Sequence, residues 1–338
     1  MNKLFKKIAA VVVAASTAVV GLTGCVAGEG SAVSAENGEA LSVIKLDYAY
    51  WNPLSLVIKD QGWAEEEFAK QGATVEWVLS AGSSKALENL NAEAIDVASS
   101  AGSAAFAARA NGATLKTIGV FSQPNWATIV VPKGSDITSV AALKGKKIAA
   151  ASGTDPYFFL LRSLSDAGLS TADVEIVNLI HADGQKALES GDVDAWAGLD
   201  PLTATSERTA GSVILSSKPE YNSWGVLSVN EKFLAAHAAE LEIVLSLYEK
   251  ARTWIAENQD AAVAILARDA SLDEGDARKV LLERTKVDVS IIPGAEQKSV
   301  LEAITPVLVA EGKIKSQEAA DNALASIYDT AIAEKVAK

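Results

Sequence analysis

The chain has 338 residues, a length that favours roughly two domains, and 49% of its residues are apolar, which is enough for large buried cores. Charged residues make up 22%, an ordinary share for a folded protein, so most of the chain is not expected to be disordered. The formal net charge of −13 argues against nucleic-acid binding, because neutralising phosphates requires a basic face.

The first 25 residues have the pattern of an export signal. Three lysines among the first seven residues precede an apolar run at 8–20, which is too short to span a bilayer comfortably but suits a signal-peptide core. The run ends in Leu-Thr-Gly-Cys at 22–25, which resembles the lipobox of bacterial lipoproteins. The resemblance implies that Cys25 is lipidated and becomes the mature N-terminus; the alternative is a plain secretory signal followed by an incidental cysteine.

A tether is expected next. Residues 26–40 are rich in Gly, Ser, Ala and Glu, a composition typical of flexible linkers, and we assign 25–42 to this tether. Cys25 is the chain's only cysteine, so no intramolecular disulfide can form. Removal of residues 1–24 takes away three lysines and gives a mature charge of −16. These features predict an exported, acidic protein anchored to the bacterial membrane, facing the periplasm or the extracellular side.

From residue 42 onward, short strands alternate with helices, which predicts an α/β fold. The expected strands are 42–48, 74–79, 95–99, 115–120, 127–131, 147–151, 174–178, 194–198 and 212–216. The expected helices between them are 53–72, 86–91, 104–110, 138–143, 155–167, 184–190 and one that starts at 201. Residues 231–335 are predicted to be nearly all helical, with an apolar stripe at Leu241, Val244, Leu245 and Tyr248.

Four turns built of small or polar residues follow predicted strands, at 52–53, 82–84, 102–103 and 153–155. In open α/β sheets ligands bind at such turns, where helix N-termini present free N–H groups and a favourable dipole to anions. Each turn by itself is also an ordinary helix cap. Together they predict one shared ligand cleft.

Several blocks of sequence resemble a known family. They are DYAYWNPLSLVIKDQGW (47–63), EAIDV (93–97), VP (131–132), LKGKK (143–147), and SGDVDAW (190–196) followed by DP (200–201). Over about 43–335 the chain resembles the periplasmic substrate-binding proteins of ABC importers for aliphatic sulfonates, which have taurine, sulfate-ester and nitrate binders as relatives.

The resemblance implies a type II-like periplasmic binding protein fold, in which two α/β lobes joined by two crossing segments close on a ligand. Lobe 1 would contain 43–130 and 226–338, with the C-terminal helices packed on it, and lobe 2 would contain 131–225. The implied ligand-binding residues are Tyr50, Asn52, Pro53, Ser80, Gly82, Ser83, Ala101, Ser103, Gln123 and Trp126 in lobe 1, and Gly153, Thr154, Asp155, Trp196 and Asp200 in lobe 2. Trp126 and Trp196 either form walls for an alkyl or aryl group or pack in the core.

Asp155 departs from the family pattern, in which a small neutral residue, commonly Ser, is expected at this position. A carboxylate repels a sulfonate by roughly a kcal/mol or more at short range. Asp155 therefore either caps its own helix or binds an ammonium or hydroxyl group of the ligand. The implied turns contain no Arg or Lys, so an anion would be held by neutral donors.

The resemblance implies a monomeric binding lipoprotein that captures a small organosulfur anion (an aliphatic sulfonate, taurine or a sulfate ester) and delivers it to a permease and its ATPase. Alternatives with the same fold bind nitrate, bicarbonate or a pyrimidine thiamin precursor. No enzyme activity, cofactor or metal is expected, because the HExxH, CxxC, GxSxG and GxxxxGK patterns are missing from the sequence. His181 and His237 are expected at the surface.

Overall fold

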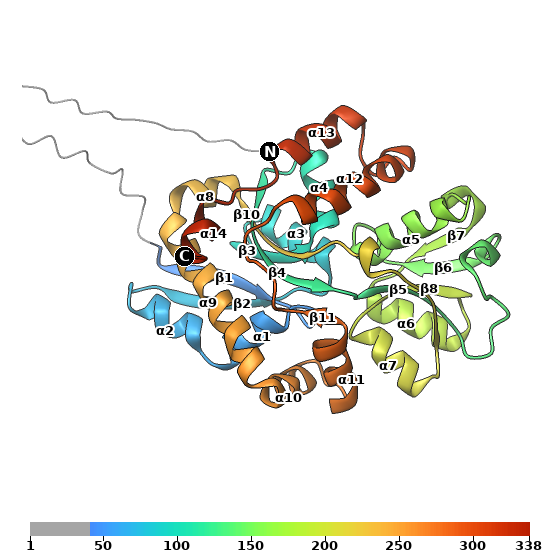
Figure 1. The fold of residues 1–338 in the computed structure, drawn as a ribbon, viewed down its shortest axis with the longest axis horizontal. Helices are drawn as coiled ribbons and strands as arrows, with labels where there is room; N and C mark the ends of the chain where they lie inside the picture. Colours follow the sequence, from blue (N-terminus) through green and yellow to red (C-terminus); the bar gives the residue numbers. More distant parts are fainter. Residues whose placement is uncertain (1–40) are drawn as a thin grey trace, which may run out of the picture. The chain divides into compact units, whose positions relative to one another are not determined.

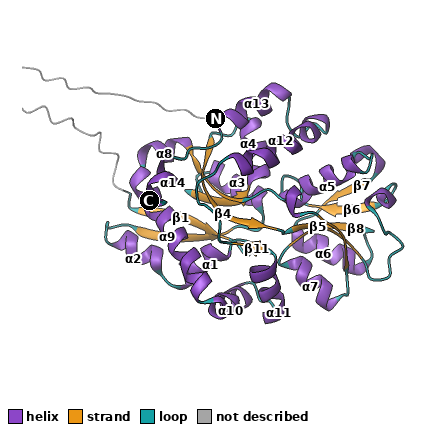
Figure 2. Ribbon diagram, viewed as in Figure 1, coloured by secondary structure: helices purple, strands orange, loops and turns teal. Residues whose placement is uncertain are grey.

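The computed structural model describes residues 41–338 and confirms the α/β class, with two separate sheets and helices around each (Figures 1 and 2). The predicted signal peptide, Cys25 and nearly all of the predicted tether lie outside the described residues. Among residues 41–338, no helix combines the length and the apolar character needed to cross a bilayer.

The first sheet has six strands in the order β11-β4-β10-β3-β1-β2. They are β1 (Val43–Tyr48), β2 (Thr74–Leu79), β3 (Val97–Ala101), β4 (Leu115–Pro124), β10 (Gly225–Asn230) and β11 (Thr285–Lys286). Strand β1 runs parallel to β2 and β3, and β10 runs antiparallel to β3 and β4. The parallel strands all end on one edge, where turns lead into helices.

The second sheet has five strands in the order β7-β6-β8-β5-β9. They are β5 (Ala127–Val131), β6 (Lys147–Ala150), β7 (Glu175–Asn178), β8 (Ala195–Leu199) and β9 (Val213–Ser217). The chain enters this sheet through 125–126 and returns to β10 of the first sheet through 218–224. The lobe boundaries at 130/131 and 225/226 stay a prediction; β5 pairs with β8 and β9, and β10 pairs with β3 and β4.

Helices from the two ends of the described chain accompany the first sheet (Figure 1). They are α1 (Pro53–Asp60), α2 (Trp63–Ala69), α3 (Ser83–Asn91), α4 (Gly102–Ala110), α8 (Glu231–Ala236), α9 (Ala238–Glu257), α10 (Gln259–Asp269), α11 (Glu274–Arg278), the π-helical turn η4 (Lys279–Glu283), α12 (Ala295–Ala310), α13 (Gln317–Ser326) and α14 (Ala331–Val336). The middle of the chain supplies α5 (Asp155–Asp166), α6 (His181–Ser190), α7 (Leu202–Thr209) and the 3₁₀ turns η1 (Val140–Leu143), η2 (Thr171–Asp173) and η3 (Pro219–Tyr221).

Local sequence explains most of these elements. Asn52 caps α1 by accepting a hydrogen bond from the Ser55 N–H, and Pro53 opens the helix. The apolar stripe of α9 is buried as predicted, at Leu241, Val244, Leu245 and Tyr248. The aromatic and aliphatic run at 158–161 is buried in α5.

Several boundaries differ from the sequence prediction. The helix predicted over 53–72 is two helices, because Gly62 takes a left-handed conformation (φ +66°) and interrupts the run. Helices α3 and α6 each begin three residues earlier than predicted, at Ser83 and His181. Strand β3 lies two residues later than predicted. The helical tail is interrupted by β11, which pairs with β4.

Candidate ligand-binding site

The Asp155 carboxylate joins the elements of the two sheets. Asp155 starts α5, which packs on the second sheet, yet both its oxygens accept hydrogen bonds from residues near the first. Oδ1 accepts from the hydroxyls of Ser103 (2.5 Å) and Ser223 (2.6 Å), and Oδ2 accepts from Nε1 of Trp126 (2.7 Å) and the N–H of Ser223 (3.0 Å). All four donors lie outside α5, so this carboxylate does not cap its own helix.

Asp155 is buried, and all the groups that donate hydrogen bonds to its carboxylate are neutral. The residue is 2% exposed, and burial raises the pKa of its carboxyl, while the hydrogen bonds from Ser103, Ser223 and Trp126 oppose the rise. Ser223 also accepts a hydrogen bond from the N–H of Ser103 (2.9 Å), and the carbonyl of Trp224 accepts one from Gly102 (2.8 Å). The first N–H groups of α4 therefore donate to the segment before β10, and the Asp155 carboxylate accepts hydrogen bonds from the other donors around this N-terminus.

A second cluster forms where the N-termini of α3, α5 and α6 meet; we call it the three-helix junction and define it by Gly82, Ser84, Gly153, Thr154 and His181. A methyl group on Gly82 would lie 3.2 Å from Nε2 of His181 and 3.9 Å from Cγ2 of Thr154. A methyl group on Gly153 would lie 3.6 Å from Cβ of Ser84. Since α3 packs on the first sheet and α5 and α6 on the second, the junction spans both.

The prediction that His181 lies at the surface is wrong, because the residue is only 4% exposed. It is the first residue of α6, and its ring packs against Gly82, which precedes α3 on the first sheet. Within the described part of the chain, neither ring nitrogen has a hydrogen-bond partner. Burial lowers the pKa of His181 to about 4, so the imidazole is neutral at pH 7, with one N–H donor and one acceptor nitrogen. His237 is half-buried, and its Nδ1 lies 3.7 Å from Glu240.

A mostly apolar groove of about 280 Å³ adjoins the junction. Ser84 and Gly153 belong to both, and the groove continues along α3, α4 and α5. Its other lining residues are Leu87, Ala104, Ala107, Ala108, Asn111, Ser152, Tyr157, Phe158 and Lys313. The Lys313 ammonium lies 5.2 Å from the centre of the Tyr157 ring. The volume is near the lower end of the range for small-molecule pockets, about 300 Å³.

Asn52 and Ser80, two of the predicted ligand residues, are engaged inside the first-sheet half. Asp47 accepts hydrogen bonds from the Ser80 hydroxyl (2.9 Å) and from the N–H and hydroxyl of Ser99 (2.9 and 2.7 Å). Asn52 donates to Ser99 (2.7 Å) and to the Tyr248 hydroxyl (3.0 Å). Burial raises the pKa of Asp47 to about 7, against the hydrogen bonds from Ser99 and Ser80.

The structure places the remaining predicted residues as follows. Ser83 accepts a hydrogen bond from the Ala101 N–H (3.0 Å), so both lie beside the junction. Pro53 is buried in α1, Tyr50 is half-buried in the turn before it, and Gln123 pairs with Lys286 at the β4–β11 edge. Trp196 is fully buried with Val130, Ala149, Ala187, Leu188 and Val193. It is packed in the core of the second sheet and does not join the other predicted residues.

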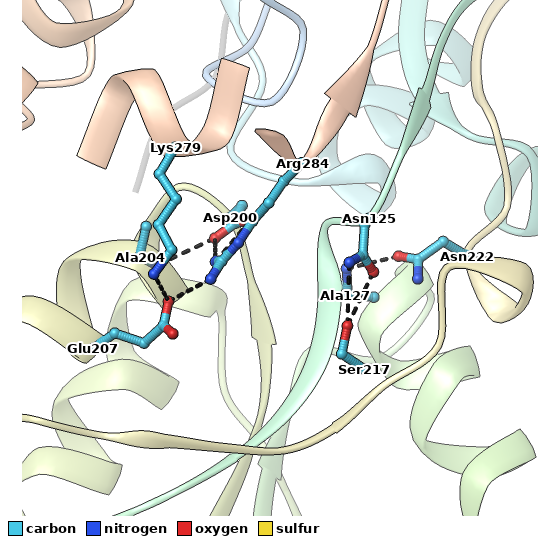
Figure 3. A network of polar contacts seen from close by, with 9 residues as sticks. All are labelled: Asn125, Ala127, Asp200, Ala204, Glu207, Ser217, Asn222, Lys279 and Arg284. Atoms are coloured by element: carbon cyan, nitrogen blue, oxygen red, sulfur yellow. Dashed lines mark hydrogen bonds and ion pairs between the residues drawn. The ribbon is translucent and has the colours of Figure 1, made fainter. Parts of the chain in front are cut away.

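Asp200 forms a network with Arg284 (Figure 3), and its N–H donates to the carbonyl of Trp126 (3.0 Å). Arg284 donates to both of its carboxylate oxygens (3.1 and 3.2 Å) and to Glu207 (2.6 Å), which also binds Lys279 (3.0 Å). Burial raises the pKa of Asp200 to about 6, against the pull of Arg284. The same view shows Asn222 accepting a hydrogen bond from the Ala127 N–H (2.7 Å).

Sequence reasoning missed His181, Ser223 and Arg284. His181 carried a usable signal, because it follows a strand and starts a helix, as the four predicted turns do. Ser223 lies in the segment that leads into β10, and Arg284 has no local signal, since its partner Asp200 is 84 residues away. Among residues 41–338, no group of three His, Cys, Asp or Glu side chains is arranged to hold a metal ion.

Comparisons with known proteins show the family of this chain. The model of the family described as "NMT1/THI5 like" matches residues 56–262. The "Putative aliphatic sulfonates-binding protein" of Bacillus subtilis is 31% identical over 229 residues, which cover 67% of this chain and 69% of the relative.

Solved structures show the same fold. The alkanesulfonate-binding protein SsuA from Xanthomonas axonopodis pv. citri bound to MOPS aligns with a TM-score of 0.75 at 24% identity, covering 84% of this chain and 98% of that one. The desulfurization enzyme DSZB aligns with a TM-score of 0.63 at 13% identity, covering 88% of this chain and 99% of that one, so the fold alone does not decide between binding and catalysis. The fold is the predicted two-lobed periplasmic binding protein fold, and the chain belongs to the NMT1/THI5-like family.

Proposed function

We propose that this chain is the extracytoplasmic solute-binding lipoprotein of an ABC importer and captures a small organosulfur anion, namely an aliphatic sulfonate, taurine or a sulfate ester. The observation that carries the proposal is the three-helix junction beside an apolar groove, both formed between elements of the two sheets. Helix N-termini favour an anionic head group, and an apolar groove favours an organic tail. The relative in Bacillus subtilis, described as a sulfonate binder, supports the same ligand class.

Ligand capture would work by closure of the two lobes. Helices and turns on both sheets contribute to the junction and the groove, so a ligand there contacts both halves and favours a closed arrangement. The groove argues against nitrate or bicarbonate as the main ligand, because a small inorganic oxyanion leaves apolar side chains unused. Binding without catalysis is the preferred function, since the chain's only cysteine is Cys25 and His181 accepts no hydrogen bond from a nucleophile within the described residues.

A thermal-shift panel tests the ligand class. Alkanesulfonates, taurine and sulfate esters are each expected to raise the melting temperature of the mature protein, while nitrate and bicarbonate are not. A ligand that binds only the native state stabilises it in proportion to RT ln(1 + [L]/Kd). A shift with nitrate or a pyrimidine precursor alone would keep the fold and replace the ligand class. No shift with any organosulfur compound would refute the proposal.

Membrane attachment through Cys25 is part of the proposal. In a bacterial host, we expect the wild-type chain to fractionate with membranes and the Cys25→Ser variant to be released, because a covalent lipid is the predicted anchor. Detergent-phase partitioning with immunoblotting measures the change, and Ser31→Ala in the predicted tether is the control. Equal membrane retention of Cys25→Ser and the wild type would contradict the lipid anchor.

A further inference from the structure

His181 is buried with no visible use for its polar atoms. It is 4% exposed, and neither Nδ1 nor Nε2 has a partner in the described residues. Buried polar groups are nearly always hydrogen-bonded, so each exception in a folded protein requires a physical reason. Leu or Met would fill the same space without burying a polar group that lacks a hydrogen-bond partner. The presence of a histidine at the start of α6 therefore points to a use for its ring nitrogens.

The backbone around His181 makes room for this ring. Gly82 faces it with φ +151°, a conformation that side chains rarely adopt, and any Cβ there would press on Nε2 at 3.2 Å and Cδ2 at 3.4 Å. Thr154 adds its methyl group to the same spot, while its hydroxyl donates to the Ala151 carbonyl (2.6 Å). The imidazole is thus positioned from both sheets.

The electrostatics of the junction select the ligand's charge. Helices α3, α5 and α6 begin here with no side-chain cap at Gly82, Thr154 or Ile180 among the residues described. Three positive dipole ends near one point favour an anion and disfavour a positive charge on the imidazole ring, and they act against the carboxylates of Asp155 and Asp183 in the first turns of α5 and α6. They therefore agree with burial in keeping the imidazole neutral, and a neutral imidazole supplies one N–H donor.

We propose that His181 is a specificity-determining residue of the cleft, whose ring N–H donates a hydrogen bond to the oxyanion head group of a sulfonate seated at the three-helix junction. The apolar tail of the sulfonate lies in the adjoining groove, which shares Ser84 and Gly153 with the junction. This inference rests on the proposed function. It adds a ligand contact from α6 to those implied by the four predicted turns.

The decisive variants are His181→Leu and His181→Gln, titrated with hexanesulfonate and with taurine by calorimetry. Leu removes the donor, so we expect hexanesulfonate affinity to fall about tenfold or more. Gln keeps an N–H donor and is expected to retain most of the affinity. The matched control is His237→Leu, the chain's other histidine, which is expected to bind as the wild type does.

Stability separates a binding role from a structural one. His181→Leu removes two unpaired polar atoms, so the melting temperature of the ligand-free variant is expected to stay equal or rise while affinity falls. Gly82→Ala, which crowds the ring, is a second variant and is expected to weaken hexanesulfonate binding. Gly112→Ala is its control, because Gly112 also has a positive φ (+107°) but has open space around it.

The outcomes separate the role of His181 from the proposed function. Wild-type affinity for hexanesulfonate in His181→Leu, or a loss confined to taurine, would overturn the donor role while leaving the proposed function intact. A wild-type protein that binds neither sulfonate would refute the proposed function itself, and the assignment of His181 with it. An equal loss in His181→Gln and His181→Leu, together with lower melting temperatures, would assign His181 to structure.

Discussion

The carboxylate of Asp155 forms hydrogen bonds between the elements of the two sheets. Its carboxylate is held by Ser103, Trp126 and Ser223, which all come from outside its own helix. A carboxylate in this place uses neutral donors that could otherwise serve a bound anion. It also adds a negative charge to the cleft in which the ligand is proposed to bind.

Replacing Asp155 is expected to change which sulfonates bind. In Asp155→Ser, affinity for a plain alkanesulfonate should rise several-fold relative to taurine, because a repulsion of about 1 kcal/mol is removed and an ammonium group loses a partner. Calorimetric titration with both ligands measures the ratio. Asp166→Ser, at the exposed end of the same helix, is the control with the same change in charge. An unchanged affinity ratio would exclude a role for Asp155 in selectivity.

Among the helices, α7 is bound to η4 (Figure 3) and to α11 by charged side chains. Arg284 binds Asp200 and Glu207, and Arg208 of α7 binds Asp276 of α11 (2.9 Å). On another flank, the Thr171 hydroxyl donates to the Glu311 carboxylate. Polar contacts therefore hold the elements of the two sheets together around the cleft.

Arg284→Gln is expected to weaken the contact that Arg284 forms with Asp200 and Glu207. Asp200 is 3% exposed, and loss of its cation leaves a buried carboxylate, which costs about 3 kcal/mol. We expect the free energy of urea unfolding to fall by that amount and the radius of gyration of the ligand-free protein to rise in solution scattering. The control is Arg268→Gln, an exposed arginine paired with Asp60 and Asp269. Arg284→Gln with wild-type stability and dimensions would show that the network does not hold the elements of the two sheets together.

The sequence predicts those helix starts, caps and apolar stripes that neighbouring residues determine. The cap at Asn52, the proline at 53 and the stripe of α9 are local signals, and the structure confirms each of them. The early starts of α3 and α6 were missed because Gly82 and Ile180 are weak caps with no capping side chain in the described chain. Contacts such as His181 with Gly82 depend on how two sheets are placed, which spacing along the chain does not reveal.

At the scale of the whole molecule, Asp47 links stability to pH. Burial raises its pKa in the folded state to about 7, above the ordinary value of 3.8. Between these values the folded state holds a proton that the unfolded state has lost, so the contribution of Asp47 to stability is complete below about pH 4 and is lost as pH rises through 7.

Asp47→Asn tests this linkage, because the amide does not titrate. The free energy of unfolding of the wild type, relative to Asp47→Asn, should fall by up to about 4 kcal/mol between pH 4 and pH 7.5, at roughly 1.4 kcal/mol per pKa unit. Urea denaturation of both proteins across this range gives the difference. Asp136→Asn, the same change at an exposed residue, is the control. A difference that is independent of pH would contradict the raised pKa of Asp47.

Binding of an organic sulfonate at the three-helix junction and its adjoining groove is the proposal on which the others depend. Its sharpest test is calorimetric titration of the mature wild-type protein with hexanesulfonate at pH 7. We expect a saturable heat with one ligand bound per chain, together with a negative heat-capacity change from burial of the tail. No saturable heat with hexanesulfonate, taurine or an alkyl sulfate ester, in protein shown to be folded, would contradict it.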